Sequence, residues 1–161
     1  MATENIEVDL TVNGESHRIS VDPRELLAQT LRERIGCTDI NIGCESSSCG
    51  ACTVQSDGQS LKSCTQFTVQ ADGADIVTLS GLAEDGVLSE IQTAFTEEHA
   101  LQCGYCTPGM VMAVDEYLDE NEDPSREEIR TEALRGNLCR CTGYENIVDA
   151  VEVAADALAE E

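Results

Sequence analysis

Nine cysteines, spaced unevenly along 161 residues, constrain the fold of this chain more than any other feature. Eight of them fall into two sets of four: Cys44, Cys49, Cys52 and Cys64, then Cys103, Cys106, Cys139 and Cys141. Cys37 has no partner at ligand spacing, and we expect it to be a small, partly buried apolar residue. A chain of this length forms one ordinary domain or two small ones. Domains of about 80 residues commonly need a disulfide or a metal centre to stabilise them. We therefore expect each set of four to hold a metal centre.

The first set has the spacing C-x4-C-x2-C with a fourth cysteine farther along, which is typical of plant-type [2Fe–2S] sites. Three thiolates on one short loop can surround a cluster, and Gly43 and Gly50 allow the backbone to approach its sulfurs and donate hydrogen bonds. Tetrahedral zinc sites usually take two short cysteine pairs, which this triplet does not resemble. The first set therefore predicts a [2Fe–2S] cluster, with zinc as the alternative.

The second set consists of two short pairs, which could hold zinc or an iron–sulfur cluster. Cys106 precedes Thr107-Pro108 and Cys141 precedes Thr142-Gly143, so each pair leads into an expected helix. The free N–H groups and positive dipole end of a helix N-terminus favour an anionic group. This context favours iron and sulfur, but spacing alone leaves zinc open.

The charge balance excludes one class of partner. The chain has 9 basic and 32 acidic residues, for a net charge of −23, so it would be repelled by nucleic acid. Disorder is not expected, because 41% of the residues are hydrophobic and regularly patterned. Lys62 is the only lysine. A folded, acidic, lysine-poor chain is typical of a protein that works in high salt, where self-repulsion is screened.

The compartment is predicted from what the sequence does not contain. Residues Met1–Asn5 show no basic stretch followed by an apolar one, and no apolar run approaches the about 20 residues of a membrane span. We therefore expect a cytoplasmic protein without membrane insertion. In that compartment, clustered cysteines bind metal or perform redox chemistry more often than they form disulfides, and an odd count argues against full pairing.

The first half predicts a compact α+β unit. Alternating apolar and polar residues predict strands over 6–12 and 16–21, joined by a hairpin at Asn13-Gly14. Asp22-Pro23 is expected to begin a helix that Gly36 ends. A cysteine-rich loop over 42–52 and three short strands near 53–55, 60–63 and 76–79 follow.

The second half predicts helices only. Apolar spacing indicates a first helix around residues 88–95, and Thr107-Pro108 begins a second. Capping boxes at Ser125/Glu128 and Thr142/Glu145 open a third and a fourth. We expect a four-helix bundle, with the domains divided as 1–81 and 82–161.

Three motifs, in order, resemble a known family. Residues 49–54, CGACTV, are similar to the first-cluster loop of the molybdenum hydroxylases. Residues 102–110, QCGYCTPGM, resemble the family's second-cluster motif, and residues 136–144, GNLCRCTGY, resemble its closing motif. The family includes xanthine dehydrogenases, aldehyde oxidoreductases and aerobic carbon monoxide dehydrogenases. The resemblance extends from about residue 5 to residue 155, which is nearly the whole chain.

The resemblance implies a ferredoxin-like β-grasp domain followed by a four-helix bundle, each holding one [2Fe–2S] cluster. It implies that Cys44, Cys49, Cys52 and Cys64, called the outer set here, bind the outer cluster. It implies that Cys103, Cys106, Cys139 and Cys141, the inner set, bind the inner cluster, and that Gln102 contacts a molybdopterin cofactor. That cofactor would lie on a large subunit, and FAD on a medium subunit.

The implied function is electron relay within a molybdenum-dependent oxidoreductase, from molybdopterin through both clusters to flavin, with no substrate chemistry on this chain. The segments Glu45–Ser48 and Lys62–Thr65 resemble most the small subunits of carbon monoxide dehydrogenase type, whose relatives oxidise other small molecules such as aldehydes and purines. Two alternatives remain: a free-standing two-cluster ferredoxin, and a zinc-bound interaction module.

Overall fold

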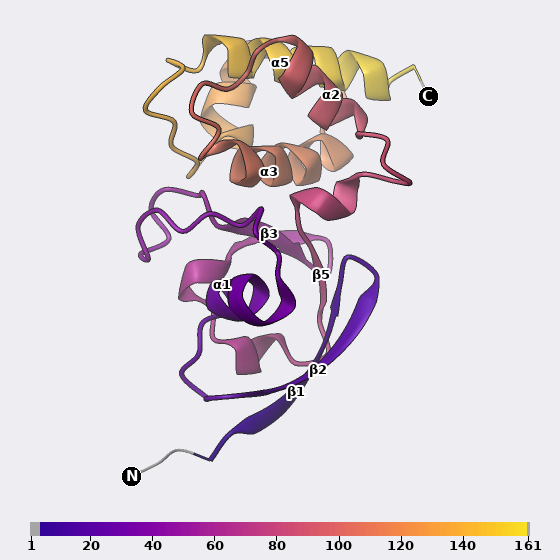
Figure 1. The fold of residues 1–161 in the computed structure, drawn as a ribbon. Helices are drawn as coiled ribbons and strands as arrows, with labels where there is room; N and C mark the ends of the chain where they lie inside the picture. Colours follow the sequence, from indigo (N-terminus) through magenta and orange to yellow (C-terminus); the bar gives the residue numbers. More distant parts are fainter. Residues whose placement is uncertain (1–3, 161) are drawn as a thin grey trace.

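The computed structural model describes residues 4–160. Residues 1–3, on which the prediction of no signal peptide partly rests, and residue 161 lie outside them. In the N-terminal half a five-stranded mixed sheet packs with short helical segments, and helices build the C-terminal half (Figure 1). The change from strands to helices that the sequence predicts is therefore present.

The sheet has the strand order β2-β1-β5-β3-β4. Its strands are β1 (Ile6–Val12), β2 (Glu15–Val21), β3 (Thr53–Ser56), β4 (Gln59–Lys62) and β5 (Asp75–Val77). β1 pairs with β5 in parallel, and the other neighbours are antiparallel. Val8, Leu10 and Val12 are buried on one face of β1, as the alternation predicts. All five predicted strands are present, with ends shifted by one or two residues.

The helix after β2 begins later than predicted. Asp22-Pro23 does not cap it: α1 spans Leu27–Gln29 and continues as a π-helical segment, Thr30–Ile35. The Asp22 carboxylate instead accepts from the backbone N–H of Arg24, which forms a turn. The next residues extend beside a distant segment, because Leu27 N–H donates to Gln66 O at 2.8 Å. Gly36, with φ of 98°, ends the helix as predicted.

The helical half contains α2 (Glu90–Glu97), α3 (Thr107–Glu120), α4 (Arg126–Glu128) and α5 (Glu145–Leu158). α4 continues as a π-helical segment over Ile129–Ala133. The predicted capping box is present, since Ser125 Oγ accepts from Glu128 N–H and the Glu128 carboxylate accepts from Ser125 N–H. Arg126 joins α4 to α5 through ion pairs of 2.6 Å with Glu145 and 2.7 Å with Asp149.

Two hydrophobic cores form, one in each half. The first joins the sheet to α1 and includes Val21, Leu31 and Ile76, and the second lies among the helices around Phe95 and Ile147. Each half therefore has its own packing, and the cysteine segments lie where the two halves meet (Figure 1).

Within residues 4–160, no helix is long and apolar enough to cross a membrane.

Candidate metal centres

The outer set lies on the loop before β3 and on the 3₁₀ turn Ser63–Thr65 after β4. Antiparallel pairing of β3 with β4 returns the chain toward the loop, and Ser63 Oγ donates to Cys52 O at 2.7 Å. Cys52 and Cys64 are buried, and Cys44 and Cys49 are half-buried. The sheet therefore carries the fourth cysteine to the three that share a loop.

The cysteine sulfurs are arranged in pairs. In the outer set Cys44 interacts with Cys49, and Cys52 with Cys64. In the inner set Cys106 interacts with Cys139, and Cys141 Sγ lies 3.6 Å from Cys103 Sγ. Within residues 4–160, no three Cys, His, Asp or Glu side chains gather closely enough to hold one metal ion. Pairing of the sulfurs within each set fits a two-iron cluster, because each of its irons takes two protein ligands.

Burial makes two of the thiols difficult to ionise in the chain alone. It raises the pKa of Cys52 to about 11, and burial together with hydrogen bonding to Cys139 raises the pKa of Cys106 to about 12. The pKa of Cys44, by contrast, is lowered to about 6 by hydrogen bonds from Ser46. Cluster ligands must be thiolates, so the buried sulfurs need positive charge beside them, which iron supplies.

The inner set lies on two segments at one end of the helical half. Cys106 directly precedes α3, and Cys139 and Cys141 lie in the loop before α5. Here one prediction is wrong: Thr142 and Glu145 form no capping box, and Tyr144 occupies the N-cap with φ of 69°. Thr142 instead donates to Cys139 Sγ through its hydroxyl at 3.1 Å and its N–H at 3.4 Å. These donors help to lower the pKa of Cys139 against the opposing effect of burial.

Tyr144 fixes the same loop from within. Its hydroxyl accepts from Cys139 N–H at 2.8 Å and donates to Asn137 O at 3.3 Å. Its positive φ is uncommon for an aromatic residue and turns the chain sharply before α5 begins. The loop that carries two inner cysteines is therefore held by side chains within it.

The two cysteine loops contact each other directly. Leu138 N–H donates to Cys49 O at 2.9 Å, and Thr53 Oγ1 lies 3.2 Å from Asn137 Oδ1. A Cβ on Gly50 would lie 2.0 Å from Asn137 Oδ1, and a Cβ on Gly109 would lie 2.1 Å from Gly50 O. Two glycines therefore allow the outer loop, the inner loop and α3 to meet at van der Waals contact, a role that their cysteine neighbours do not predict.

Gln102 lies on the surface beside Cys103, and both residues are exposed. Tyr105, three residues farther along, and Leu138, beside Cys139, are also exposed, at 48% and 59%. Tyr105 also joins the halves, because its hydroxyl donates to Ile42 O at 2.9 Å. The implied contact of Gln102 with a pterin stays a prediction.

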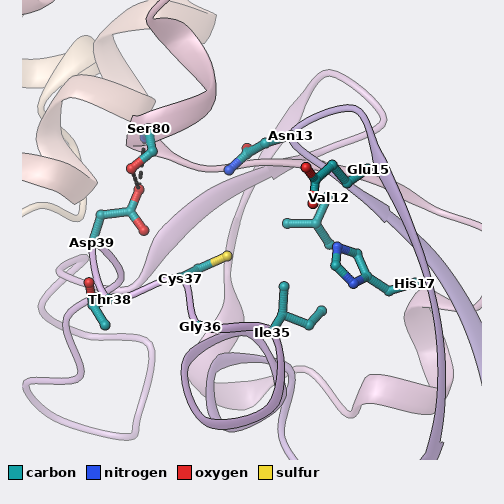
Figure 2. Close-up of a pocket in the computed structure, with 10 residues that line it drawn as sticks. All are labelled: Val12, Asn13, Glu15, His17, Ile35, Gly36, Cys37, Thr38, Asp39 and Ser80. Atoms are coloured by element: carbon teal, nitrogen blue, oxygen red, sulfur yellow. Dashed lines mark hydrogen bonds between the residues drawn. The ribbon is translucent and has the colours of Figure 1, made fainter. Parts of the chain in front are cut away.

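Cys37 takes no part in either set. It packs against the core of the sheet half and lines a hollow of about 340 Å³ between the β1–β2 hairpin and the end of the first helix (Figure 2). The Asp39 carboxylate beside it accepts hydrogen bonds from Ser80 Oγ at 2.9 Å and Ser80 N–H at 2.8 Å. Burial raises the pKa of Cys37. A packed, un-ionised thiol is the role that its isolated position predicts.

Two side chains have contacts that the sequence does not predict. The Thr142 hydroxyl donates a hydrogen bond to Cys139 Sγ. Lys62 reaches Asn137 across the contact between the halves, with Nζ 3.4 Å from Asn137 Oδ1. The position of Thr142 directly after Cys-x-Cys is the signal that would have indicated the first contact. Nothing local to Lys62 indicates the second, because the contact joins segments 75 residues apart.

Comparisons with known proteins agree with this geometry. Residues 10–80 match the family model described as a 2Fe-2S iron-sulfur cluster binding domain, and residues 78–152 match one described as a [2Fe-2S] binding domain. The chain is 48% identical to the nicotine 6-hydroxylase small subunit of Paenarthrobacter nicotinovorans, over 92% of this chain and 89% of that one. It is 47% identical to the nicotinate dehydrogenase small FeS subunit of Eubacterium barkeri, over 96% and 98%.

A solved structure gives the same result for the fold. The quinoline 2-oxidoreductase of Pseudomonas putida 86 contains a chain that is 44% identical, with a TM-score of 0.92 over 98% of each chain. The N-terminal half is thus a ferredoxin-like [2Fe–2S] domain, and a second [2Fe–2S] domain follows it in the C-terminal half. The chain belongs to the small iron–sulfur subunits of the molybdenum hydroxylase family.

Proposed function

We propose that this chain is an electron-transfer subunit that carries two [2Fe–2S] clusters within a molybdenum-dependent oxidoreductase. The observation that carries the proposal is the arrangement of eight cysteines as four sulfur pairs, two in each half. Bound clusters supply one-electron transfer, and the chain itself performs no substrate chemistry. Its residues hold the sulfurs, limit their exposure to water and donate hydrogen bonds to them.

The outer set (Cys44, Cys49, Cys52 and Cys64) would hold one cluster, and the inner set (Cys103, Cys106, Cys139 and Cys141) the other. The domains would divide as 1–81, a β-grasp domain, and 82–161, a four-helix bundle. Both family models end or begin close to that boundary, at residues 80 and 78. This division is also supported by the two separate hydrophobic cores.

Two partners complete the proposed relay: a large subunit with molybdopterin and a medium subunit with FAD. Exposed Cys103 and Cys141 favour the inner set as the side that meets the large subunit, where Gln102 would contact the pterin. Electrons would enter there and leave through the outer set toward flavin. The assembly would work in the cytoplasm.

The substrate belongs to the large subunit. Relatives are named for nicotine, nicotinate and caffeine, which are nitrogen heterocycles. We therefore propose that the substrate is a nitrogen heteroaromatic compound, in preference to carbon monoxide. The likeness of residues 45–48 and 62–65 to the carbon monoxide dehydrogenase type stays a prediction. Oxidation of nicotinate or quinoline by the purified complex supports this order, and oxidation of carbon monoxide alone reverses it.

Metal and flavin analysis of the complex purified in high salt tests the function. We expect about four irons per chain, which is the sum of two [2Fe–2S] clusters, together with molybdenum and flavin. The same iron without molybdenum or flavin would support a free-standing ferredoxin instead. Zinc in place of iron would support an interaction module and overturn the proposal.

A further inference from the structure

The only lysine of the chain lies beside the outer set. Lys62 ends β4, where its cross-strand partner is Thr53, the residue after Cys52. Its side chain is half-buried, and Nζ donates to Thr53 Oγ1 at 2.7 Å and to Asn137 Oδ1 at 3.4 Å. These contacts fix the ammonium group at the junction of the two cysteine loops.

The ammonium group lies close to the outer set. Lys62 stands two residues before Cys64, and its partner Thr53 directly follows Cys52. The carboxylate of Glu116, on α3, is its acidic neighbour, and both side chains line the same surface hollow. A positive charge held by two hydrogen bonds and partly shielded from water is screened by salt much less than one on the open surface.

Within residues 4–160, no basic side chain is hydrogen-bonded beside the inner set in a matching way. Arg140 lies between two inner cysteines in the sequence, but it is exposed, so water and salt weaken its effect. The inner sulfur of Cys139 depends on a neutral donor, the Thr142 hydroxyl. The outer set therefore has a fixed cation in addition to a neutral donor at Cys44, whereas Cys139 in the inner set has neutral donors.

Charge next to a cluster changes the energy of its reduced form. A [2Fe–2S] cluster gains one negative charge on reduction, which burial of Cys52 and Cys64 disfavours and a nearby cation favours. In a chain with a net charge of −23, a single fixed cation in this position opposes the general field of the protein. Its effect is therefore expected to be local and specific to the outer cluster.

We propose that Lys62 raises the reduction potential of the outer cluster relative to the inner one, and so favours passage of each electron outward. In that one-electron exchange the inner cluster is oxidised, the outer cluster is reduced, and no proton or bond is transferred. The inference rests on the proposed function, since it requires both clusters. Lys62 is a tuning residue and contributes no ligand.

EPR-monitored redox titration of the intact complex tests the inference. Lys62→Met removes the charge and should lower the outer-cluster potential while leaving the inner one in place. We expect the equilibrium constant for electron transfer from the inner to the outer cluster to fall about tenfold. This corresponds to a shift of about 59 mV in the potential of a one-electron couple. Lys62→Arg keeps the charge and should retain most of the wild-type potential.

A matched variant at the inner site assigns the two signals. Thr142→Val removes only the hydroxyl that donates to Cys139 Sγ, so the signal whose potential it lowers belongs to the inner cluster. Should Lys62→Met fail to assemble, Lys62→Gln, which keeps a hydrogen-bonding tip for Thr53, carries the same expectation. Glu116→Gln should shift the outer potential in the opposite direction.

The inference is overturned if the neutral variants leave the outer potential unchanged, if both clusters move equally, or if Lys62→Arg shifts as far as Lys62→Met. The last result would make side-chain shape the cause instead of charge. Failure of the proposed function looks different, because wild-type protein would then show fewer than two reducible clusters before any variant is compared.

Discussion

At the scale of single residues, the two cysteine sets differ in the donors that face their sulfurs. Cys44 Sγ accepts from the backbone N–H of Ser46 at 3.4 Å, and Cys139 Sγ accepts from the Thr142 hydroxyl at 3.1 Å. Hydrogen bonds to the ligand sulfurs raise cluster potentials because they stabilise added negative charge. We therefore expect the Ser46 N–H and the Thr142 hydroxyl to raise the potentials of their clusters, and only their nearness to cysteine in the sequence indicates it.

Cys141→Ser tests the assignment of the inner set. Its sulfur lies 3.6 Å from that of Cys103, so replacing it leaves one iron of the inner cluster short of a thiolate. We expect iron content to fall by about half, from about four to about two irons per chain, with the outer cluster retained and electron export lost. Cys37→Ser is the matched control and should keep all the iron. A Cys141→Ser complex with both clusters and full turnover would contradict the ligand assignment.

Gly50→Ala tests the contact between the loops. Gly50 has φ of 75°, and an added Cβ would lie 2.4 Å from the Gly136 carbonyl oxygen. We expect destabilisation of about 3 kcal/mol or more, because backbone strain and overpacking both act there. Gly58→Ala is the control, since its φ of 80° is similar but nothing lies within 4 Å of the added Cβ. It should cost about 1 kcal/mol.

Both variants are compared with wild type by thermal unfolding followed by circular dichroism. The difference between them measures the close approach of the two halves, separate from backbone conformation. Equal losses of stability would mean that the contact around Asn137 does not contribute to holding the halves together.

At the scale of elements, the sequence predicts strands well and helix starts less well. The hairpin at Asn13-Gly14 and the capping box at Ser125 depend on neighbours in the chain, and both are present. Asp22 fails as a helix start because residues 25–27 bond to the distant segment 66–68. Thr142 fails as a cap because its Oγ1 accepts from Tyr144 N–H and donates to Cys139 Sγ, while the helix begins only at Glu145. Local propensity includes neither the distant segment that holds residues 25–27 nor the cysteine sulfur that orients Thr142.

The same limit applies to the candidate site. Cysteine spacing predicts which residues form each set, because a cluster requires four thiolates at short range. The contact between the sets depends on Gly50, Gly109 and Asn137, whose proximity comes from the packing of α3 against β3. All three residues lie within the cysteine motifs, but no motif indicates that they meet, so the sequence predicts two sites and the structure joins them.

Asp115, on α3, is a half-buried carboxyl in that interface. Burial raises its pKa, while the hydrogen bond from Gln55 Nε2 at 2.7 Å opposes the shift. A raised pKa means that the folded state binds the proton more tightly, so ionisation of Asp115 costs stability above that pKa and the cost vanishes as the pH falls through it. Asp115→Asn removes that cost and keeps an oxygen for Gln55.

We therefore expect the melting temperature of Asp115→Asn to gain on that of wild type as the pH rises from about 4 to about 7. Asp156→Asn, an equal change at an exposed position on α5, should show no such trend. Melting curves at several pH values provide the measurement. A difference in melting temperature between Asp115→Asn and wild type that stays constant with pH would show that burial does not raise the pKa of Asp115.

At the scale of the whole molecule, two small cores are combined with an extreme negative charge. The net charge of −23 is spread over a chain whose described surface measures 8769 Å². Each half has its own hydrophobic core, and hydrogen bonds such as Leu138 N–H to Cys49 O join the halves. Repulsion among the acidic side chains therefore opposes the packing of the two halves against each other.

Salt should strengthen this molecule. Added KCl screens repulsion among exposed carboxylates, so we expect the melting temperature to rise between about 0.1 M and about 3 M KCl. Each kcal/mol gained corresponds to about 2–4 °C for a chain of this size, and the rise should reach at least that. The surface ion pair of Arg126 with Glu145 weakens in salt, but exposed pairs contribute little.

The control for the salt effect is the same measurement at lower pH, where the net negative charge is smaller. Nearer the isoelectric point of about 4.1, fewer carboxylates are ionised, so the same KCl series at about pH 5 should give a smaller rise. A general effect of salt on hydrophobic burial would persist at both pH values. A melting temperature that does not rise with KCl at neutral pH would count against adaptation to high salt, and the acidic surface would then need a different physical explanation.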